Sequence, residues 1–269
     1  DLKLGFSGKN NATFYLSNGT KRQRMNPSKK TDLKQLAVRI WRGRENGAFE
    51  TYAVPRQENQ TVLDVVTFIQ RRIDPTLTYR FSCRVGVCGS CAMTVNGRGR
   101  WTCRSNISDI APDGHLELAP LRNLPIIKDL MVDMEVFFDK FAAAGSAFVP
   151  ENTALTTFAH VKPDSKERQA VEAAIECIGC GVCYSACDVV AANPDYLGPA
   201  ALNRAWSLWN DVRDGHGLQI LRMVANDAGC LACHSHQSCQ EQCPKKLNPT
   251  KSIAGLKKAS ALAALKGTL

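Results

Sequence analysis

Twelve cysteines carry most of the chemistry that this sequence offers, and they fall into three groups of four. The first group has the spacing C-x4-C-x2-C, followed by a short two-strand segment and one further cysteine. Its members are Cys83, Cys88, Cys91 and Cys103. This is the ligand spacing of a plant-type [2Fe–2S] cluster. Gly86 and Gly89 allow the loop to bend sharply, so that its N–H groups turn toward the cluster sulfurs.

The second and third groups have the spacing of bacterial ferredoxins. The second reads C-x2-C-x2-C-x3-C, and the fourth cysteine of such a run ligates the other cluster of a pair. Counted back from Cys243, the same template fits the third group except that His236 replaces a cysteine. The two runs should therefore exchange ligands. The predicted [4Fe–4S] ligands are Cys177, Cys180, Cys183 and Cys243, and the predicted ligands of the other cluster are Cys187, Cys233 and Cys239.

A cubane that lacks one protein ligand readily exists as a [3Fe–4S] cluster, and this is our assignment for the second cubane-type site. Two alternatives stay open at this point. His236 could ligate the fourth iron, because imidazole suits iron. Cys230, the one cysteine without an assigned role, could complete the cubane instead.

Zinc and disulfides are the competing interpretations of so many cysteines. Zinc sites pair C-x2-4-C knuckles and do not need a glycine-lined C-x4-C-x2-C loop. Disulfide frameworks occur mostly in small secreted domains, whereas clustered C-x2-C patterns in a longer chain indicate metal. The cysteine pattern therefore favours iron–sulfur clusters in a reducing compartment over a zinc-stabilised scaffold.

Composition bounds the remaining possibilities. The chain has 269 residues, 44% hydrophobic residues and a formal net charge of +9, which describes a globular protein with room for two domains. No apolar run approaches the roughly 20 residues of a membrane-spanning helix. The basic residues are scattered, without the aromatic interleaving of a nucleic-acid groove, so we expect no nucleic-acid partner. A basic surface that contacts a membrane or a partner is as compatible with the charge as a solvated one.

The predicted elements describe an α+β protein. Alternating apolar residues over 36–40 and 49–54 predict a β-hairpin, and Thr61 can cap a helix that follows. Short strands near 92–95 and 116–118 complete a β-grasp sheet crossed by that helix, and the cluster loop precedes them. We predict a [2Fe–2S] ferredoxin-like domain over 36–125, after an N-terminal extension over 1–35.

The segment PLRNLP at 120–125 is interpreted as the hinge to an all-helical domain over 126–269, which carries the other two clusters. Its first helix is predicted over Lys128–Ala143, with Leu130, Val132, Met134, Phe137, Phe138 and Phe141 on the buried side. Pro199 fits the first turn of a helix, and Lys251–Leu265 is a further helix.

No nucleotide-binding fingerprint and no Ser/His/Asp arrangement is found, so no catalytic residue is predicted. Three clusters in one chain indicate an electron relay between redox centres that the chain does not itself bind.

The order of the three groups, with CRVGVCGSCAMTVNG, PLRNLPIIKDLMVDM, CIGCGVCYSAC, YLGPAAL and CPKKLNP, resembles the iron–sulfur subunit of succinate dehydrogenase and fumarate reductase, respiratory complex II. The resemblance implies a flavoprotein partner that carries covalent FAD and the dicarboxylate site, together with membrane-anchor subunits that hold quinone. Electrons would pass from FAD through [2Fe–2S], [4Fe–4S] and [3Fe–4S] to quinone, in the tricarboxylic acid cycle and respiration. The chain would lie on the cytoplasmic face of a bacterial inner membrane or the matrix face of the mitochondrial one.

Within this resemblance, His234 and Lys257 match residues near the quinone. The sequence departs from the family pattern at Asp188, where a proline is usual, and at Ala191–Ala192, where many succinate dehydrogenases have tryptophans. Some fumarate reductases also lack these tryptophans, so the same architecture working as a quinol:fumarate reductase is the alternative. A soluble or thiol-linked fumarate reductase component is a further one.

Overall fold

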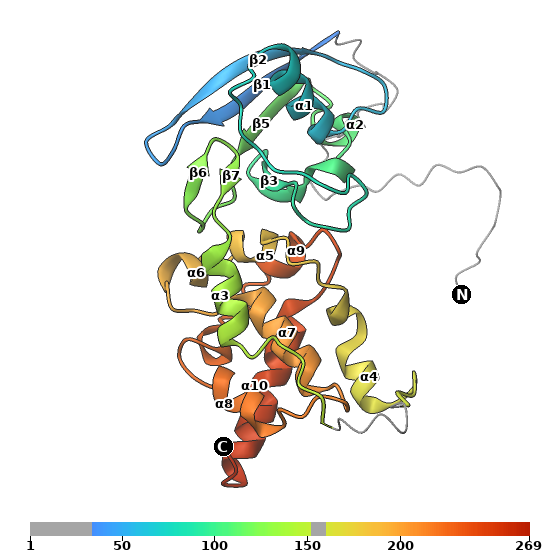
Figure 1. Ribbon diagram of the computed structural model, residues 1–269, viewed down its shortest axis with the longest axis vertical. Helices are drawn as coiled ribbons and strands as arrows, with labels where there is room; N and C mark the ends of the chain where they lie inside the picture. Colours follow the sequence, from blue (N-terminus) through green and yellow to red (C-terminus); the bar gives the residue numbers. More distant parts are fainter. Residues whose placement is uncertain (1–33, 152–159) are drawn as a thin grey trace, which may run out of the picture. The chain divides into compact units, whose positions relative to one another are not determined.

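The computed structural model describes residues 34–151 and 160–269, which belong to one compact unit. The predicted extension over residues 1–35 lies almost entirely outside the described residues. The predicted boundary between the two domains stays a prediction, and the α+β class is confirmed: a sheet with its helix precedes a helical part (Figure 1).

A five-stranded sheet forms the first part, in the order β2-β1-β5-β3-β4. Its strands are β1 (Gln35–Arg42), β2 (Ala48–Pro55), β3 (Ala92–Val95), β4 (Arg98–Trp101) and β5 (His115–Ala119). β1 and β5 are parallel, and the other pairs are antiparallel. The predicted hairpin and short strands are thereby confirmed. β4 lies at the edge of the sheet, and Cys103 follows it after one residue, Thr102.

Helix α1 (Val62–Arg72) packs its apolar face into the core of the sheet. Thr61 caps it as expected: its hydroxyl accepts the Asp64 N–H, and the Asp64 carboxylate accepts the Thr61 N–H. Val62, Val65 and Ile69 are buried there because they recur at helical spacing. The helix thus holds the sheet from which the first cysteine loop projects.

The predicted helix over Lys128–Ala143 is wrong in its first half. Residues 126–132 form a small hairpin, β6 (Ile126–Lys128) and β7 (Met131–Val132), and helix α3 spans Glu135–Ala143. Asp129 is the reason: its φ is +53°, and its buried carboxylate accepts the N–H groups of Gly43 (2.7 Å) and Thr78 (2.8 Å). These long-range bonds hold a turn where the apolar spacing alone favoured a helix. Of the side chains predicted to be buried, Leu130, Val132 and Phe137 are buried, whereas Phe138 is 54% exposed.

The second part is built from short helices around two longer ones. They are α4 (Lys166–Val171), α5 (Val182–Ser185), α6 (Asp188–Ala192), α7 (Pro199–Trp209), α8 (Leu218–Val224), α9 (Ser238–Glu241) and α10 (Pro249–Leu265); α2 (Ile107–Ile110) belongs to the first part. Pro199 begins α7 as predicted, and α10 includes the predicted last helix. α7 and α10 lie against one another so closely that a Cβ on Gly255 would lie 2.6 Å from the ring of Trp206.

Residues 120–125 connect the two parts and form hydrogen bonds to residues 184–187 of the second part. The side-chain amide of Asn123 donates to the carbonyls of Tyr184, Ser185 and Cys187, each at 3.2 Å. The neighbouring Arg122 N–H donates to the Ser185 hydroxyl at 2.8 Å. The carbonyls of Tyr184 and Cys187 also accept backbone N–H groups, so the Asn123 amide adds to the hydrogen bonds at the end of α5. The segment that leaves the sheet therefore also orders the turn that carries Cys183 and Cys187.

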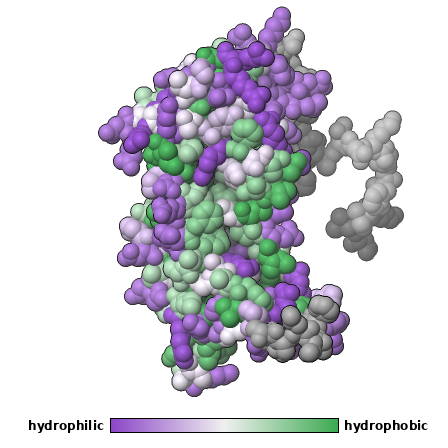
Figure 2. Space-filling view, in the orientation of Figure 1, coloured by the Kyte–Doolittle hydropathy of each residue, from purple (hydrophilic) through white to green (hydrophobic). Residues whose placement is uncertain are grey.

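No helix among the described residues is long and apolar enough to cross a membrane. On the face shown in Figure 2, apolar side chains gather in the middle of the view, with mostly hydrophilic side chains above and below.

Candidate metal-cluster sites

The first site is a loop that bends back on its own sulfurs. Gly86 and Gly89 adopt φ values of +72° and +71°, which glycine reaches without strain. The bends aim three N–H groups at the Cys83 sulfur, from Val85, Val87 and Cys88, each at 3.4 Å. The backbone that the glycines shape is thus a set of donors to sulfur.

These donors change the chemistry of Cys83. The N–H groups of Val87, Cys88 and Val85 lower the pKa of the Cys83 thiol to about 6, because they stabilise the thiolate. A thiolate is the form of cysteine that ligates metal. Cys83 is therefore prepared as a ligand at neutral pH by the loop itself.

Cys91 and Cys103 form the inner wall of the same site. Both are buried, and Leu63 of α1 packs against them. Burial raises the pKa of the Cys103 thiol to about 11, and Cys91 and Cys83 add to the shift because their charges lie close to it. The cysteines of the first predicted set thus come together, from one loop and from the turn after β4.

The second site brings together cysteines that are far apart in the sequence. One cavity is lined by Cys177, Cys180, Cys183 and Cys243, with Ala200, Asn203 and Leu247. Burial raises the pKa of the Cys180 thiol to about 12 and that of Cys183 well above its usual value. The Leu247 N–H donates to the Cys243 sulfur at 3.4 Å.

A second cavity is lined by the remaining predicted ligands, Cys187, Cys233 and Cys239. The Cys233 sulfur accepts the Ser235 N–H at 3.4 Å, and the Cys239 sulfur lies 3.4 Å from the Thr250 hydroxyl. Cys187, from the second cysteine group, thus lies with Cys233 and Cys239 of the third group. In return, Cys243 of the third group lies with the other three cysteines of the second group. This is the exchange that the spacing predicts.

The two candidates for a fourth ligand of the third site, His236 and Cys230, differ in their position relative to its cavity. His236 lines the cavity of Cys187, Cys233 and Cys239, whereas Cys230 is absent from its lining. Cys230 is fully buried; burial raises the pKa of its thiol, and the neighbouring Ser260 and Lys257 of α10 oppose that shift. The cysteine that the sequence left without a role therefore faces α10.

The residues predicted near quinone lie beside the third site. His234 lines its cavity and a shallow surface hollow shared with Val189 and Ala192. The ammonium group of Lys257 donates to the Cys233 carbonyl at 2.6 Å. Both residues are therefore neighbours of a cysteine predicted as a ligand.

Sequence reasoning missed Tyr196 as a site residue. Its side chain is 1% exposed and lines the third cavity. Burial raises its pKa well above the usual value, and the nearby Cys233, Cys187 and Cys239 raise it further. The phenol thus stays protonated and can donate a hydrogen bond toward sulfur. The single signal in the sequence was its place in YLGPAAL, where no ligand spacing marks it.

The donor sets fit iron–sulfur clusters. Thiol groups meet in three sets, backbone N–H groups point at several of the sulfurs, and Gly89 provides a bend where a side chain would collide. Among the described residues, no group of three or more His, Cys, Asp or Glu side chains could hold a single metal ion.

Fold and sites together define an iron–sulfur protein with more than one cluster. Residues 35–139 match the family model described as a 2Fe-2S iron-sulfur cluster binding domain, and residues 173–247 match a 4Fe-4S dicluster domain.

Characterised relatives narrow this class. The chain is 35% identical over 221 residues to the fumarate reductase iron-sulfur subunit of Mycobacterium tuberculosis, covering 82% of this chain and 89% of the relative. It is also 35% identical over 221 residues to the succinate dehydrogenase iron-sulfur subunit of Paracoccus denitrificans, covering 79% and 82%. A chain of the Mycobacterium smegmatis Sdh1 complex in the apo form superposes with a TM-score of 0.76 at 26% identity, covering 84% and 95%.

The chain belongs to the family of iron–sulfur subunits of succinate dehydrogenase and fumarate reductase, and is thus a subunit of an oxidoreductase complex. The family that the motifs predicted is thereby confirmed.

Proposed function

We propose that this chain relays electrons from the FAD of a flavoprotein subunit to membrane quinone, as part of a succinate:quinone oxidoreductase. Bound iron–sulfur clusters would supply the one-electron chemistry. The ligands would be Cys83, Cys88, Cys91 and Cys103 for [2Fe–2S]; Cys177, Cys180, Cys183 and Cys243 for [4Fe–4S]; and Cys187, Cys233 and Cys239 for [3Fe–4S].

One contact carries the proposal. A Cβ placed on Gly89 would lie 2.7 Å from the Cβ and 2.9 Å from the Cα of Cys180, so the backbone of the first loop touches a cysteine of the second site. The second and third sites are also neighbours, because the charge of Cys239 contributes to the raised pKa of Cys183. The three cysteine sets thus form a series, as a relay requires.

The three-iron assignment of the last site rests on what the chain offers there. Three cysteines line the cavity, His236 lies at the fourth position, and Cys230 faces Ser260 and Lys257 instead. A cavity with three thiol ligands supports [3Fe–4S] over a cubane.

The partners follow from the family. A flavoprotein with the dicarboxylate site would lie next to the first site, and membrane anchors with quinone would lie next to His234 and Lys257. The chain would then be peripheral on the inner face of the membrane. Relatives named for succinate oxidation and for fumarate reduction are equally similar, at 35% identity, so quinol:fumarate reduction is the second candidate.

Electron paramagnetic resonance of the anaerobically purified native complex tests the relay. We expect an isotropic three-iron signal in the oxidised sample and a [2Fe–2S] signal after succinate is added. Cys91→Ser should remove the [2Fe–2S] signal and stop turnover, whereas Cys230→Ala, which alters a buried cysteine outside the three sets, should keep all signals. Normal succinate-to-quinone turnover without the [2Fe–2S] cluster would refute the relay order.

A further inference from the structure

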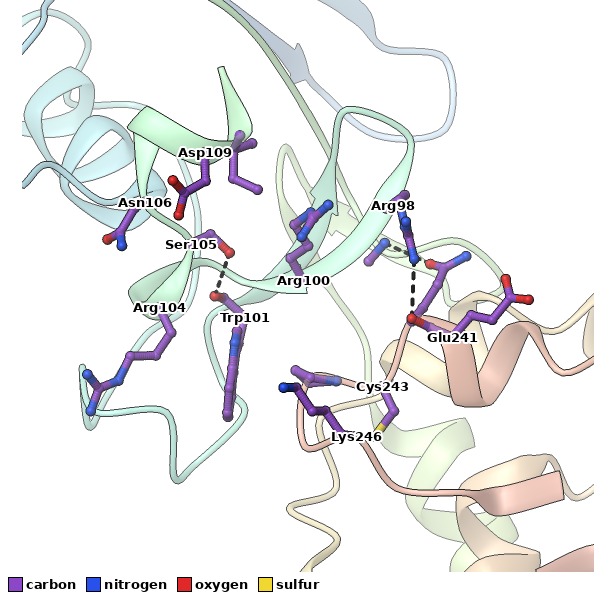
Figure 3. A pocket seen from close by; sticks show the side chains of 14 residues that line it. Arg98, Arg100, Trp101, Arg104, Ser105, Asn106, Asp109, Glu241, Cys243 and Lys246 are labelled. Carbon is purple, nitrogen blue, oxygen red and sulfur yellow. Dashed lines mark hydrogen bonds between the residues drawn. The ribbon is translucent and has the colours of Figure 1, made fainter. Parts of the chain in front are cut away.

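A pocket of about 360 Å³ lies between the edge strand β4 and the loop from Glu241 to Lys246. Figure 3 shows β4 with Arg98, Arg100 and Trp101 on one side, and the loop with Cys243 and Lys246 on the other. Its volume is that of a small-molecule site. Neither the proposed relay nor the family resemblance assigns it a role.

The pocket is lined by more positive than negative groups. Four basic side chains and two acidic ones contribute to it: Arg98, Arg100, Arg104, Lys246, Asp109 and Glu241. Within residues 34–151 and 160–269, neither acidic side chain forms an ion pair. Four positive charges minus two negative charges leave the lining with a formal excess of two positive charges.

Among the basic side chains of the pocket, Arg100 has a guanidinium group with an unused hydrogen-bond donor. Its Nε is buried without a hydrogen-bond partner, and its guanidinium forms no ion pair with any described residue. Burial lowers its pKa, and the nearby positive charge of Arg98 lowers it further. A partly buried guanidinium beside a second one, with a donor unused, is unfavourable unless an anion accepts its hydrogen bonds.

Arg98 is held in place by the opposite loop, and both Arg98 and Lys246 have N–H donors to spare. Arg98 donates one N–H to the Glu241 carbonyl at 3.2 Å, and the Gly99 N–H donates to the Gln242 side chain at 3.0 Å. These bonds fix β4 against the opposite loop. Lys246 has a φ of +57°, which sets the direction in which the loop presents its side chain, and no described residue pairs with its ammonium group.

We propose that this pocket binds a small oxyanion of the phosphate type, held by Arg100 with Arg98 and Lys246. Guanidinium groups recognise such oxyanions through paired N–H···O bonds, and a lysine adds a compact positive charge. The pocket adjoins Cys243 and the strand that leads to Cys103, which the proposed function assigns to two different clusters. If that function holds, a bound anion lowers the reduction potentials of those clusters, because negative charge favours their oxidised forms.

Calorimetric titration of the native complex with inorganic phosphate tests the site, with chloride at equal ionic strength as the reference. The matched pair of variants is Arg100→Gln and Arg71→Gln, since Arg71 is an exposed arginine in the last turn of α1. We expect saturable binding by the parent and by Arg71→Gln, and binding at least about tenfold weaker in Arg100→Gln. If Arg100→Gln fails to assemble, Lys246→Gln takes its place, with the same expected direction.

Equal phosphate affinity in the two arginine variants, or no binding to the complex, would overturn the site. A redox titration followed by electron paramagnetic resonance tests the linkage. Tenfold tighter binding to the oxidised form corresponds to a decrease of 59 mV for one electron. Potentials that do not change with phosphate would overturn the linkage. Absence of iron together with intact phosphate binding would refute the proposed relay and leave the site standing.

Discussion

Gly89→Ala should separate the first cysteine site from the second. Gly89 has a φ of +71°, and an added Cβ would lie 2.7 Å from the Cys180 Cβ. Carbon atoms in contact prefer about 3.5–4.0 Å, so the loop and Cys180 would have to move apart by about 1 Å. The collision involves the Cα and Cβ atoms of Cys180, which rotation of its side chain does not move.

The free-energy cost of Gly89→Ala has two parts. A side chain in the left-handed region costs about 1–2 kcal/mol, and overpacking a close contact costs about 1–3 kcal/mol more. Gly97→Ala distinguishes the conformational cost from the packing cost. Gly97 has a φ of +75°, and nothing lies within 4 Å of the added Cβ. Gly97→Ala should therefore show the conformational cost alone.

Thermal loss of the cluster absorbance in the native complex measures the difference between the two variants. We expect Gly89→Ala to lose its clusters at least about 2 °C below Gly97→Ala, since each kcal/mol shifts the midpoint by about 2–4 °C at this size. We also expect weaker magnetic coupling between the reduced clusters in Gly89→Ala. Identical midpoints and identical coupling in the two variants would refute the contact between Gly89 and Cys180, and with it the main support for the relay.

Three further predictions concern the segment that connects the two parts, the third cysteine site and a hydrogen bond to Asp74. Asn123→Ala should destabilise the complex by about 2–4 kcal/mol, because three carbonyls lose a donor and alanine must adopt a φ of +63°; urea unfolding measures this. His236→Cys should replace the isotropic three-iron signal with that of a cubane, since His236 lines the third cavity, and a retained three-iron signal would contradict this. The Thr76 hydroxyl holds the pKa of Asp74 below its usual 3.8, so this interaction stabilises the fold above that pH and is lost as the pH falls through the lowered pKa. The stability gap between the parent and Asp74→Asn should thus be equal at pH 7 and 5 and shrink as the pH falls below 3.8, and a gap that grows on acidification would contradict the assignment.

Local patterns predicted local structure well. The capping box of α1 and the alternation of β1 and β2 are interactions between residues close in sequence, so their signals are complete in a short window. The helix predicted to begin at Lys128 was wrong over residues 128–132 for the opposite reason. The turn there depends on the Asp129 carboxylate reaching Gly43 and Thr78, which lie far away in the chain.

The sequence by itself determined the three cysteine sets, because ligand spacing reflects the size and shape of a cluster rather than the rest of the fold. Tertiary structure alone decided what surrounds those sets. It placed Tyr196 beside the third site, turned Cys230 toward α10 and brought Gly89 onto Cys180. It also left Arg100 without an acidic partner in the described residues. These contacts join residues far apart in the sequence, and they arise only when β4, α5 and the last loop pack together.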